Sequence, residues 1–212
     1  MESLKLLVAD DHEVVRNGVR SLLEAQPGWH VTAEASNGRE AVEKAKRLKP
    51  DVVVLDIGMP SLNGLEAARQ MIKNDPHIKI VILTMHESEN LIREVLKVGA
   101  RGYVSKADAI QDLVTAINAV RSGVTFFTAK VSEIVLEGYL DKSGATNSRL
   151  TPRQREIIQL LAEGQSSKEI AVALGLSVKT ADTHRANIMR RLNCHSASEI
   201  VRYAVRNHII EA

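Results

Sequence analysis

The stretch "LKLLVADDHEVVR", residues 4–16, runs an apolar strand into two adjacent carboxylates, Asp10 and Asp11, and then into a helical pattern. Four further short apolar runs follow, and each is separated from the next by an amphipathic stretch. The expected strands are 4–9, 30–35, 52–56, 79–84 and 102–105, and the expected helices are 13–25, 38–48, 64–74, 88–98 and 107–121. This alternation predicts an α/β fold, with a parallel sheet covered by helices on both faces.

The composition fits a globular chain with room for two cores. It has 212 residues, of which 44% are hydrophobic and 25% charged. No apolar run reaches the ~20 residues of a membrane helix, and "MESLKLL" at the N-terminus lacks the features of a signal peptide. The single cysteine, Cys194, excludes an intrachain disulfide and a thiolate metal cluster. We therefore expect a cytoplasmic protein that has no membrane partner.

The chain divides into three parts. Residues 1–121 carry the strand and helix alternation, and 122–148 read as a linker with a connecting helix in its middle. Residues 149–212 contain four short helical stretches, each starting at a Ser or Thr cap candidate, and Pro152 stands at the first helical position of the first. This last part holds ten Lys and Arg against six Asp and Glu, a net charge of +4, whereas residues 1–148 carry −2. A basic second part hints at a polyanion partner.

Polar groups stand where the expected strands end. They are Asp10, Asp11, Asp56, Thr84 and, just past the fifth strand, Lys106. In a doubly wound (βα)5 sheet of order 2-1-3-4-5, of the flavodoxin-like type, these ends line one crevice. Clustered carboxylates stay ionised beside a hard cation, and Mg²⁺ suits oxygen ligands. The alternative is that the aspartates only cap the helices that follow them.

Several motifs together resemble a known family. They are "VVVLDIGMPSLNGLEA" (52–67), "VILTMHES" (81–88) and "GARGYVSKAD" (99–108). With the aspartate pair, they resemble the receiver domain of two-component response regulators. The segment "LGLSVKTADTHRANIMRRL" (174–192) resembles a LuxR-type helix-turn-helix. The whole chain is similar to the NarL/FixJ subfamily, which implies a sensor histidine kinase as one partner and promoter DNA as the other.

The resemblance also implies roles for individual residues. Asp56 is the implied phosphoacceptor, with Lys106, Thr84 and Tyr103 as the residues that sense the phosphoryl group. Asp11, Asp56 and the backbone carbonyl of Gly58 are the implied Mg²⁺ ligands, and Asp10 acts through water. Two positions depart from the family pattern. Ala107 stands where many receivers have proline, and Gly58 offers no side chain toward the phosphoryl group, so the lifetime of the acyl phosphate stays open.

The second helix of the helix-turn-helix is the expected DNA reader. Helical spacing turns Ala181, Ile188 and Leu192 toward the core. Asp182, Thr183 and Ala186 then face the major groove. The expected DNA contacts are completed by Lys168, Lys179, Thr180, Arg185, Asn187 and Arg190. A solvated basic helix is the alternative, and the last helix is either core packing or a dimer contact.

Three functions compete at this point. The first is a transcription factor switched by phosphorylation, which forms a homodimer when phosphorylated and whose receiver covers the reader helix when it is not. The second is a Mg²⁺-dependent aspartyl-phosphate phosphatase, but such enzymes need a second aspartate at position 58, which is glycine here. The third is a constitutive DNA-binding protein, which a broken acidic row would favour. The row is intact, so we expect the first, a phosphoacceptor that is not a dedicated enzyme.

Overall fold

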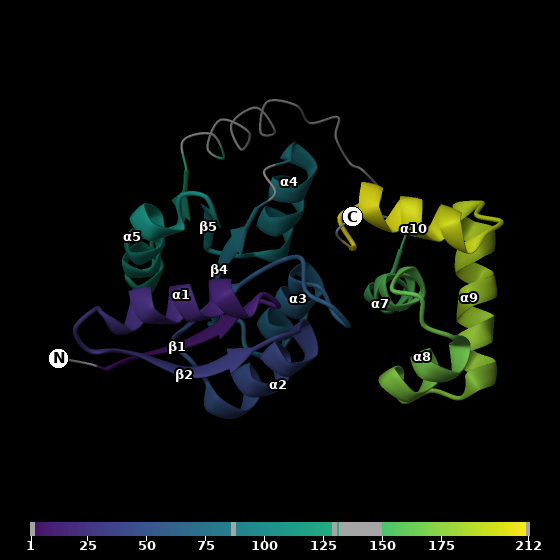
Figure 1. Ribbon diagram of the computed structural model, residues 1–212, viewed down its shortest axis with the longest axis horizontal. Coiled ribbons are helices and arrows are strands. Elements are labelled where there is room, and N and C mark those ends of the chain that lie inside the picture. Colours follow the sequence, from purple (N-terminus) through teal and green to yellow (C-terminus); the bar gives the residue numbers. More distant parts are fainter. Residues whose placement is uncertain (1–2, 86–87, 129–130, 132–149, 211–212) are drawn as a thin grey trace.

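The computed structural model describes residues 3–85, 88–128, 131 and 150–210, and it shows two bodies joined by the linker (Figure 1). The first body is an α/β domain and the second is a small helical domain. Most of the connecting helix expected within 122–148 lies outside the described residues. None of the described helices combines the length and apolar character that crossing a bilayer requires.

The first domain is built on a parallel sheet. Its strands are β1 (Leu4–Ala9), β2 (Trp29–Ala35), β3 (Val52–Leu55), β4 (Lys79–Thr84), β5 (Gly102–Ser105) and β6 (Phe126–Phe127). Their order is β2-β1-β3-β4-β5-β6, so the expected order 2-1-3-4-5 is confirmed. The sixth strand was not expected. Phe126 and Phe127 pair in parallel with Gly102 and Tyr103 of β5, which extends the sheet past residue 121.

Helices cover both faces of the sheet, as the apolar strands require. They are α1 (Glu13–Glu24), α2 (Gly38–Leu48), α3 (Gly64–Asn74), α4 (Glu89–Val98) and α5 (Ala109–Arg121). Buried residues of α1 and α5, such as Leu23 and Ile117, pack with Leu6 and Val54 on one face. Residues of α2, α3 and α4 pack with Leu7, Leu55 and Tyr103 on the other.

Local sequence fixes where these helices begin. Asn37, Asn63 and Ser88 cap α2, α3 and α4, since each side chain accepts a hydrogen bond from a backbone N–H three residues later. Gly64 follows one of these caps in a very confined place. A Cβ there would lie 1.9 Å from the carbonyl oxygen of Asp56. Only glycine therefore lets α3 start so close to the end of β3.

The second domain consists of α7 (Pro152–Ala162), α8 (Ser167–Leu174), α9 (Val178–Leu192) and α10 (Ala197–Arg206). Thr151 and Ser166 form capping boxes at α7 and α8, and Ser177 and Ser196 cap α9 and α10. The expected caps are confirmed. The core is shared by all four helices and includes Ile157, Ile170, Ile188 and Ile200.

Candidate functional site

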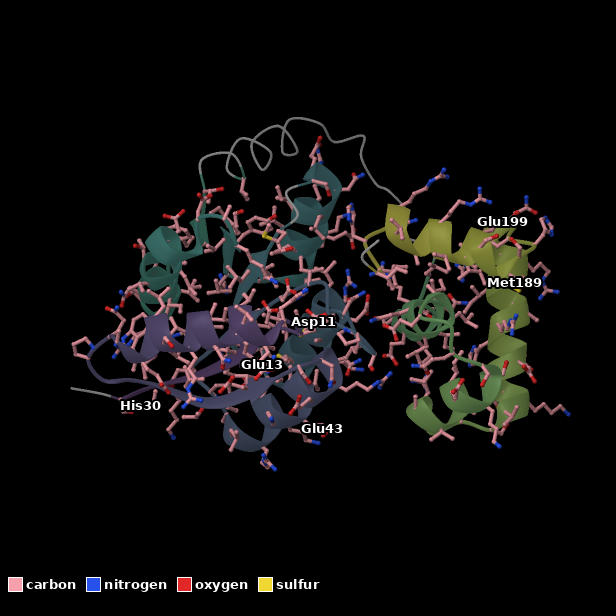
Figure 2. All side chains as sticks on the ribbon, viewed as in Figure 1. Asp11, Glu13, His30, Glu43, Met189 and Glu199 are labelled. Atoms are coloured by element: carbon pink, nitrogen blue, oxygen red, sulfur yellow. The ribbon has the colours of Figure 1, made fainter. Side chains whose placement is uncertain are left out.

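The row of residues at the strand ends converges on one point of the receiver. One ligand atom from each of Asp10, Asp11, His12 and Asp56 lies within 4.8 Å of all the others. Asp10 and Asp56 are each only 2% exposed, whereas Asp11 is partly open to solvent. Figure 2 labels Asp11 at the point where β1 passes into α1. Neighbouring residues of a strand point to opposite faces of the sheet. Asp10 and Asp11 can both reach one site because the chain leaves the strand at this point.

Lys106 pairs with both buried carboxylates. Its Nζ lies 2.8 Å from Oδ2 of Asp10 and 2.9 Å from Oδ2 of Asp56. Burial would lower the pKa of Lys106, but the two carboxylates outweigh it and the pKa is raised. For Asp56, burial dominates and raises the pKa to about 6, although Lys106 acts in the opposite direction. The carboxyl group of Asp56 therefore gains or loses its proton closer to neutral pH than an ordinary aspartate does.

The donor set fits a hard divalent cation. Oδ1 of Asp56 is buried and has no hydrogen-bond partner among the described residues. A buried carboxylate oxygen in that state is costly unless something binds it. Carboxylates of Asp10, Asp11 and Asp56 supply oxygen ligands of the kind that Mg²⁺ prefers, and the carbonyl of Gly58 lies on the same loop.

The helix-capping alternative finds little support, because the N-cap residue of α1 is His12 and its side chain makes no capping hydrogen bond. Oδ1 of Asp10 accepts a hydrogen bond of 2.9 Å from the backbone N–H of His12, at the start of α1. The sequence analysis missed His12, whose Nδ1 lies 2.8 Å from Oδ1 of Asp11. Its position directly after the aspartate pair was the available signal. Asp10 thus accepts a hydrogen bond from the residue that precedes α1 and also lines the acidic site.

Thr84 and Tyr103 lie on neighbouring strands beside the site. Thr84 is fully buried, and its carbonyl accepts a hydrogen bond of 2.9 Å from the backbone N–H of Lys106. Tyr103 pairs with Ile82 in the sheet, and its ring is buried in the core formed with α3 and α4. The sheet register therefore ties both residues to the segment that carries Lys106.

The reader helix presents the expected face. Ala181 and Ile188 are buried in the core of the second domain, and Leu192 packs partly against it. The expected DNA contacts Lys168, Lys179, Thr180, Asp182, Thr183, Ala186, Asn187 and Arg190 are exposed, and Arg185 is half-buried. Two of them already interact, because Arg190 donates to Oδ1 of Asn187 at 2.7 Å.

The expectation that the receiver covers the reader helix is wrong for this structure. Helix α9 packs on α7 and α8. Figure 1 shows it on the side of its domain away from the receiver, and Figure 2 labels Met189 of α9 at that outer edge. The receiver faces α7 and the C-terminal end of the chain instead. The sequence could not show this, because periodicity assigns a helix its core face and does not say which domain lies next to it.

The interface between the domains uses the loop after the candidate phosphoacceptor. Gln159 of α7 accepts a hydrogen bond from the N–H of Asn63 at 2.8 Å and donates one to the carbonyl of Met59 at 3.0 Å. Glu163 accepts from the N–H of Ser61 at 3.0 Å. The side chain of Asn63 donates to the carbonyl of Ile209 at 3.1 Å. Sequence reasoning missed these residues, since no local pattern marks a contact between distant segments.

Charged and polar pairs extend this interface over α3 and α4. Arg155 lies 3.1 Å from the buried carboxylate of Glu66, and Gln70 donates to Glu156 at 2.9 Å. The hydroxyl of Ser88, which caps α4, lies 2.9 Å from Nε2 of His208. The second domain is thus docked against the elements that follow β3 and β4.

Two family models match the chain. The response regulator receiver domain matches residues 6–118, and the family described as bacterial regulatory proteins, luxR family, matches residues 148–204. Oxygen regulatory protein NreC of Staphylococcus carnosus (strain TM300) is 35% identical over 216 residues, covering 98% of this chain and 100% of that protein.

Solved structures agree with this assignment. The RcsB response regulator of Salmonella typhimurium is 28% identical, with a TM-score of 0.60 over 97% of this chain and 100% of that one. A two-component response regulator RcsB–DNA complex is 26% identical, with a TM-score of 0.60 over 97% of this chain and 99% of that one. The chain therefore belongs to the two-component response regulators of the NarL/FixJ subfamily, DNA-binding regulators of transcription that join a receiver to a LuxR-type helix-turn-helix domain.

Proposed function

We propose that phosphorylation of Asp56 by a sensor histidine kinase switches the regulation of transcription by this protein. The observation that carries the proposal is the state of the Asp56 carboxylate. It is buried, it is paired through Oδ2 with Lys106, and its Oδ1 has no hydrogen-bond partner among the described residues. A carboxylate oxygen in that state is available as a nucleophile.

The transfer can be written in terms of this chain's residues. Oδ1 of Asp56 forms a bond to phosphorus while the bond from phosphorus to the kinase histidine nitrogen breaks, and that nitrogen keeps the electron pair. The ammonium of Lys106 already lies against Asp56 and is placed to neutralise the phosphoryl oxygens. Thr84, on the neighbouring strand β4, would respond to the new group by donating a hydrogen bond from its hydroxyl.

Mg²⁺ is the proposed cofactor. Asp11, Asp56 and the carbonyl of Gly58 would hold it, with Asp10 acting through water, and when bound it neutralises charge on the transferring group. Asp10 also pairs with the Lys106 ammonium, at 2.8 Å. We infer in addition that this regulator assists its own phosphoryl transfer and the hydrolysis of its acyl phosphate.

The phosphatase alternative has less support. Gly58 stands two residues after Asp56 on the same loop, where a second carboxylate would have to act as general acid. Among the described residues, the acids and histidine grouped with Asp56 are Asp10, Asp11 and His12, and all three come from the end of β1 rather than from the loop after Asp56. The proposed role of the site is therefore to hold a phosphoryl group, which suits a switch.

The output domain is proposed to bind promoter half-sites as a homodimer when phosphorylated. The exposed residues of α9 supply base and phosphate contacts, and a dimer would place two such helices on paired half-sites. A neighbouring structure contains two RcsB dimers bound to two parallel DNAs. DNA as the partner places the proposed activity in the cytoplasm.

A labelling experiment tests the proposal. The full chain, Mg²⁺ and acetyl phosphate should give a phosphoryl group on Asp56, located by mass spectrometry of the peptides. Asp56→Asn should remove the label. Asp51→Asn is a matched control, because Asp51 is an exposed acid at the start of β3 and asparagine can still accept the hydrogen bond from Lys5. A label on another residue, or equal labelling of Asp56→Asn, would overturn the assignment.

A further inference from the structure

The DNA-binding domain reaches into the loop that follows Asp56. Gln159 is only 1% exposed, and every polar atom of its carboxamide is used. Its oxygen accepts from the N–H of Asn63, and its nitrogen donates to the carbonyl of Met59 and to Glu163 at 2.8 Å. Glu163 in turn accepts from the N–H of Ser61. One side chain of α7 therefore holds both ends of a five-residue turn of the receiver.

The same turn is tied tightly to the phosphorylation site. Met59 lies directly after Gly58, whose carbonyl is the proposed metal ligand. The N–H of Gly64 donates to the carbonyl of Ile57 at 2.9 Å, and Gly64 sits against the carbonyl of Asp56 with no room for a Cβ. Asn63 also caps α3 through Oδ1, 2.9 Å from the N–H of Glu66. The loop is held at both of its ends, so a displacement of the backbone at Asp56 is coupled to a displacement at Gln159.

We propose that Gln159 is a positioning residue of the phosphorylation site, supplied by the DNA-binding domain, and that its docking opposes phosphorylation of Asp56. The inference rests on the proposed function. A phosphoryl group adds bulk and charge to a side chain that is only 2% exposed, and in this proposal the loop held by Gln159 yields to admit it. Docking through Gln159 stabilises the loop as it is without that group. Linkage then makes the effect reciprocal, so phosphorylation weakens the docking to the same degree.

Hydrogen exchange of single amides in the full chain tests the positioning. The N–H groups of Asn63 and Ser61 find their acceptors in the other domain, so their exchange reports the docked contact directly. Gln159→Ala should speed exchange of the Asn63 amide by about three- to tenfold, the effect of losing one hydrogen bond. Gln165→Ala is the matched control. Gln165 lies in the same domain, is half-buried, and makes no side-chain hydrogen bond among the described residues.

Phosphorylation measured on the same variants tests the coupling. At a limiting concentration of acetyl phosphate with Mg²⁺, Gln159→Ala should raise the ratio of phosphorylated to unmodified chain by about three- to tenfold. Gln165→Ala should match the wild type. A ratio in Gln159→Ala that is equal to or below the wild-type ratio would overturn the proposal, even if exchange at Asn63 is faster. Unchanged exchange at Asn63 would overturn it as well.

Two milder variants cover the case in which Gln159→Ala does not fold. Gln159→Glu keeps an acceptor for the N–H of Asn63 but removes the donor to Met59, and Glu163→Ala removes only the acceptor for Ser61. Both should raise the phosphorylated fraction, and failure of both to do so would sink the inference. The same measurements separate a failure of this inference from a failure of the proposed function. Wild-type chain that takes no label on Asp56 contradicts the function, whereas equal labelling of wild type and all docking variants contradicts only the role of Gln159.

Discussion

The proposed phosphorylation site and the proposed reader helix α9 are built in opposite ways. Asp10 and Asp56 are buried and Lys106 nearly so, at the carboxyl ends of strands whose register fixes them against each other. Most of the expected DNA contacts on α9 are exposed, and the helix packs against the rest of its domain through its opposite, buried face. The first site has its proposed acceptor and ligands within the chain, so that only the proposed cation and phosphoryl group come from outside. The second takes its final geometry from the partner, so changes to the two should differ in size.

The largest effect is expected at Lys106. Lys106→Met leaves the carboxylates of Asp10 and Asp56 buried without their counter-charge, and it also removes the cation beside the incoming phosphoryl group. Charge-assisted contacts of this kind are worth about 1.5 to 3 kcal/mol. The rate of Asp56 labelling by acetyl phosphate should fall about 10- to 100-fold. Lys73→Met, at an exposed position on α3, is the control. If it slows labelling as much as Lys106→Met does, the loss reflects the net charge of the protein acting on the anionic acetyl phosphate and not the contacts of Lys106.

The second effect concerns stability in the absence of metal. Burial raises the pKa of Asp56 to about 6, so the folded chain binds this proton more tightly than the unfolded chain does. Ionisation therefore costs stability, and the cost grows as the pH rises from about 4 to about 6. Asp56→Asn carries no such cost. The stability advantage of Asp56→Asn over the wild type, measured as the difference between their free energies of unfolding, should therefore grow by up to about 3 kcal/mol between pH 4 and pH 7.

Denaturant unfolding in EDTA at several pH values measures this difference. Mg²⁺ at pH 7 should reduce it, because the cation stabilises the ionised carboxylate of the wild type alone. A difference that stays constant with pH would mean that Lys106 already compensates the burial of Asp56.

The two regions also differ in how far the sequence predicts them. The strand ends could be predicted because the apolar runs, their order and the side at which parallel strands end follow from local pattern and sheet geometry. The outward face of α9 followed from helical periodicity. The strand at Phe126–Phe127 was missed, because a two-residue strand is defined by its pairing with β5 and has no periodicity of its own. Gln159 was missed for a similar reason, since its partners Met59 and Asn63 are about a hundred residues away.

A smaller effect is expected at Asp182, an exposed acid on the basic reader helix. Against phosphates it is unfavourable, so it either is a bystander or accepts a hydrogen bond from a cytosine amino group in the major groove. We expect the base contact. Asp182→Ala should then lose about 1 to 3 kcal/mol of discrimination at one base pair of each half-site, measured by selection from a randomised duplex library. A uniform gain of affinity for every sequence would identify a bystander.

The smallest effect is expected from removing the receiver altogether. Since α9 lies on the side of its domain away from the receiver, a single short duplex should reach it in the full chain as well as in the isolated segment 149–212. The remaining difference is electrostatic, because residues 1–148 carry a net charge of −2. At 0.15 M salt, charges are screened over about 8 Å. The DNA affinity of the full chain should therefore be lower than that of the isolated segment by a factor of less than about three.

Fluorescence anisotropy with one short duplex at two salt concentrations measures this, and the gap should shrink as salt rises. Arg190→Ala, an exposed position on α9, should weaken both forms alike and so confirms that both use the same helix. A full chain that binds tenfold or more weakly at both salt concentrations would mean that the receiver covers the reader helix in solution. If the full chain and the isolated segment bind equally well, α9 is not masked and phosphorylation cannot act by uncovering it. Its effect on DNA binding then has to come from how two copies are brought onto paired half-sites.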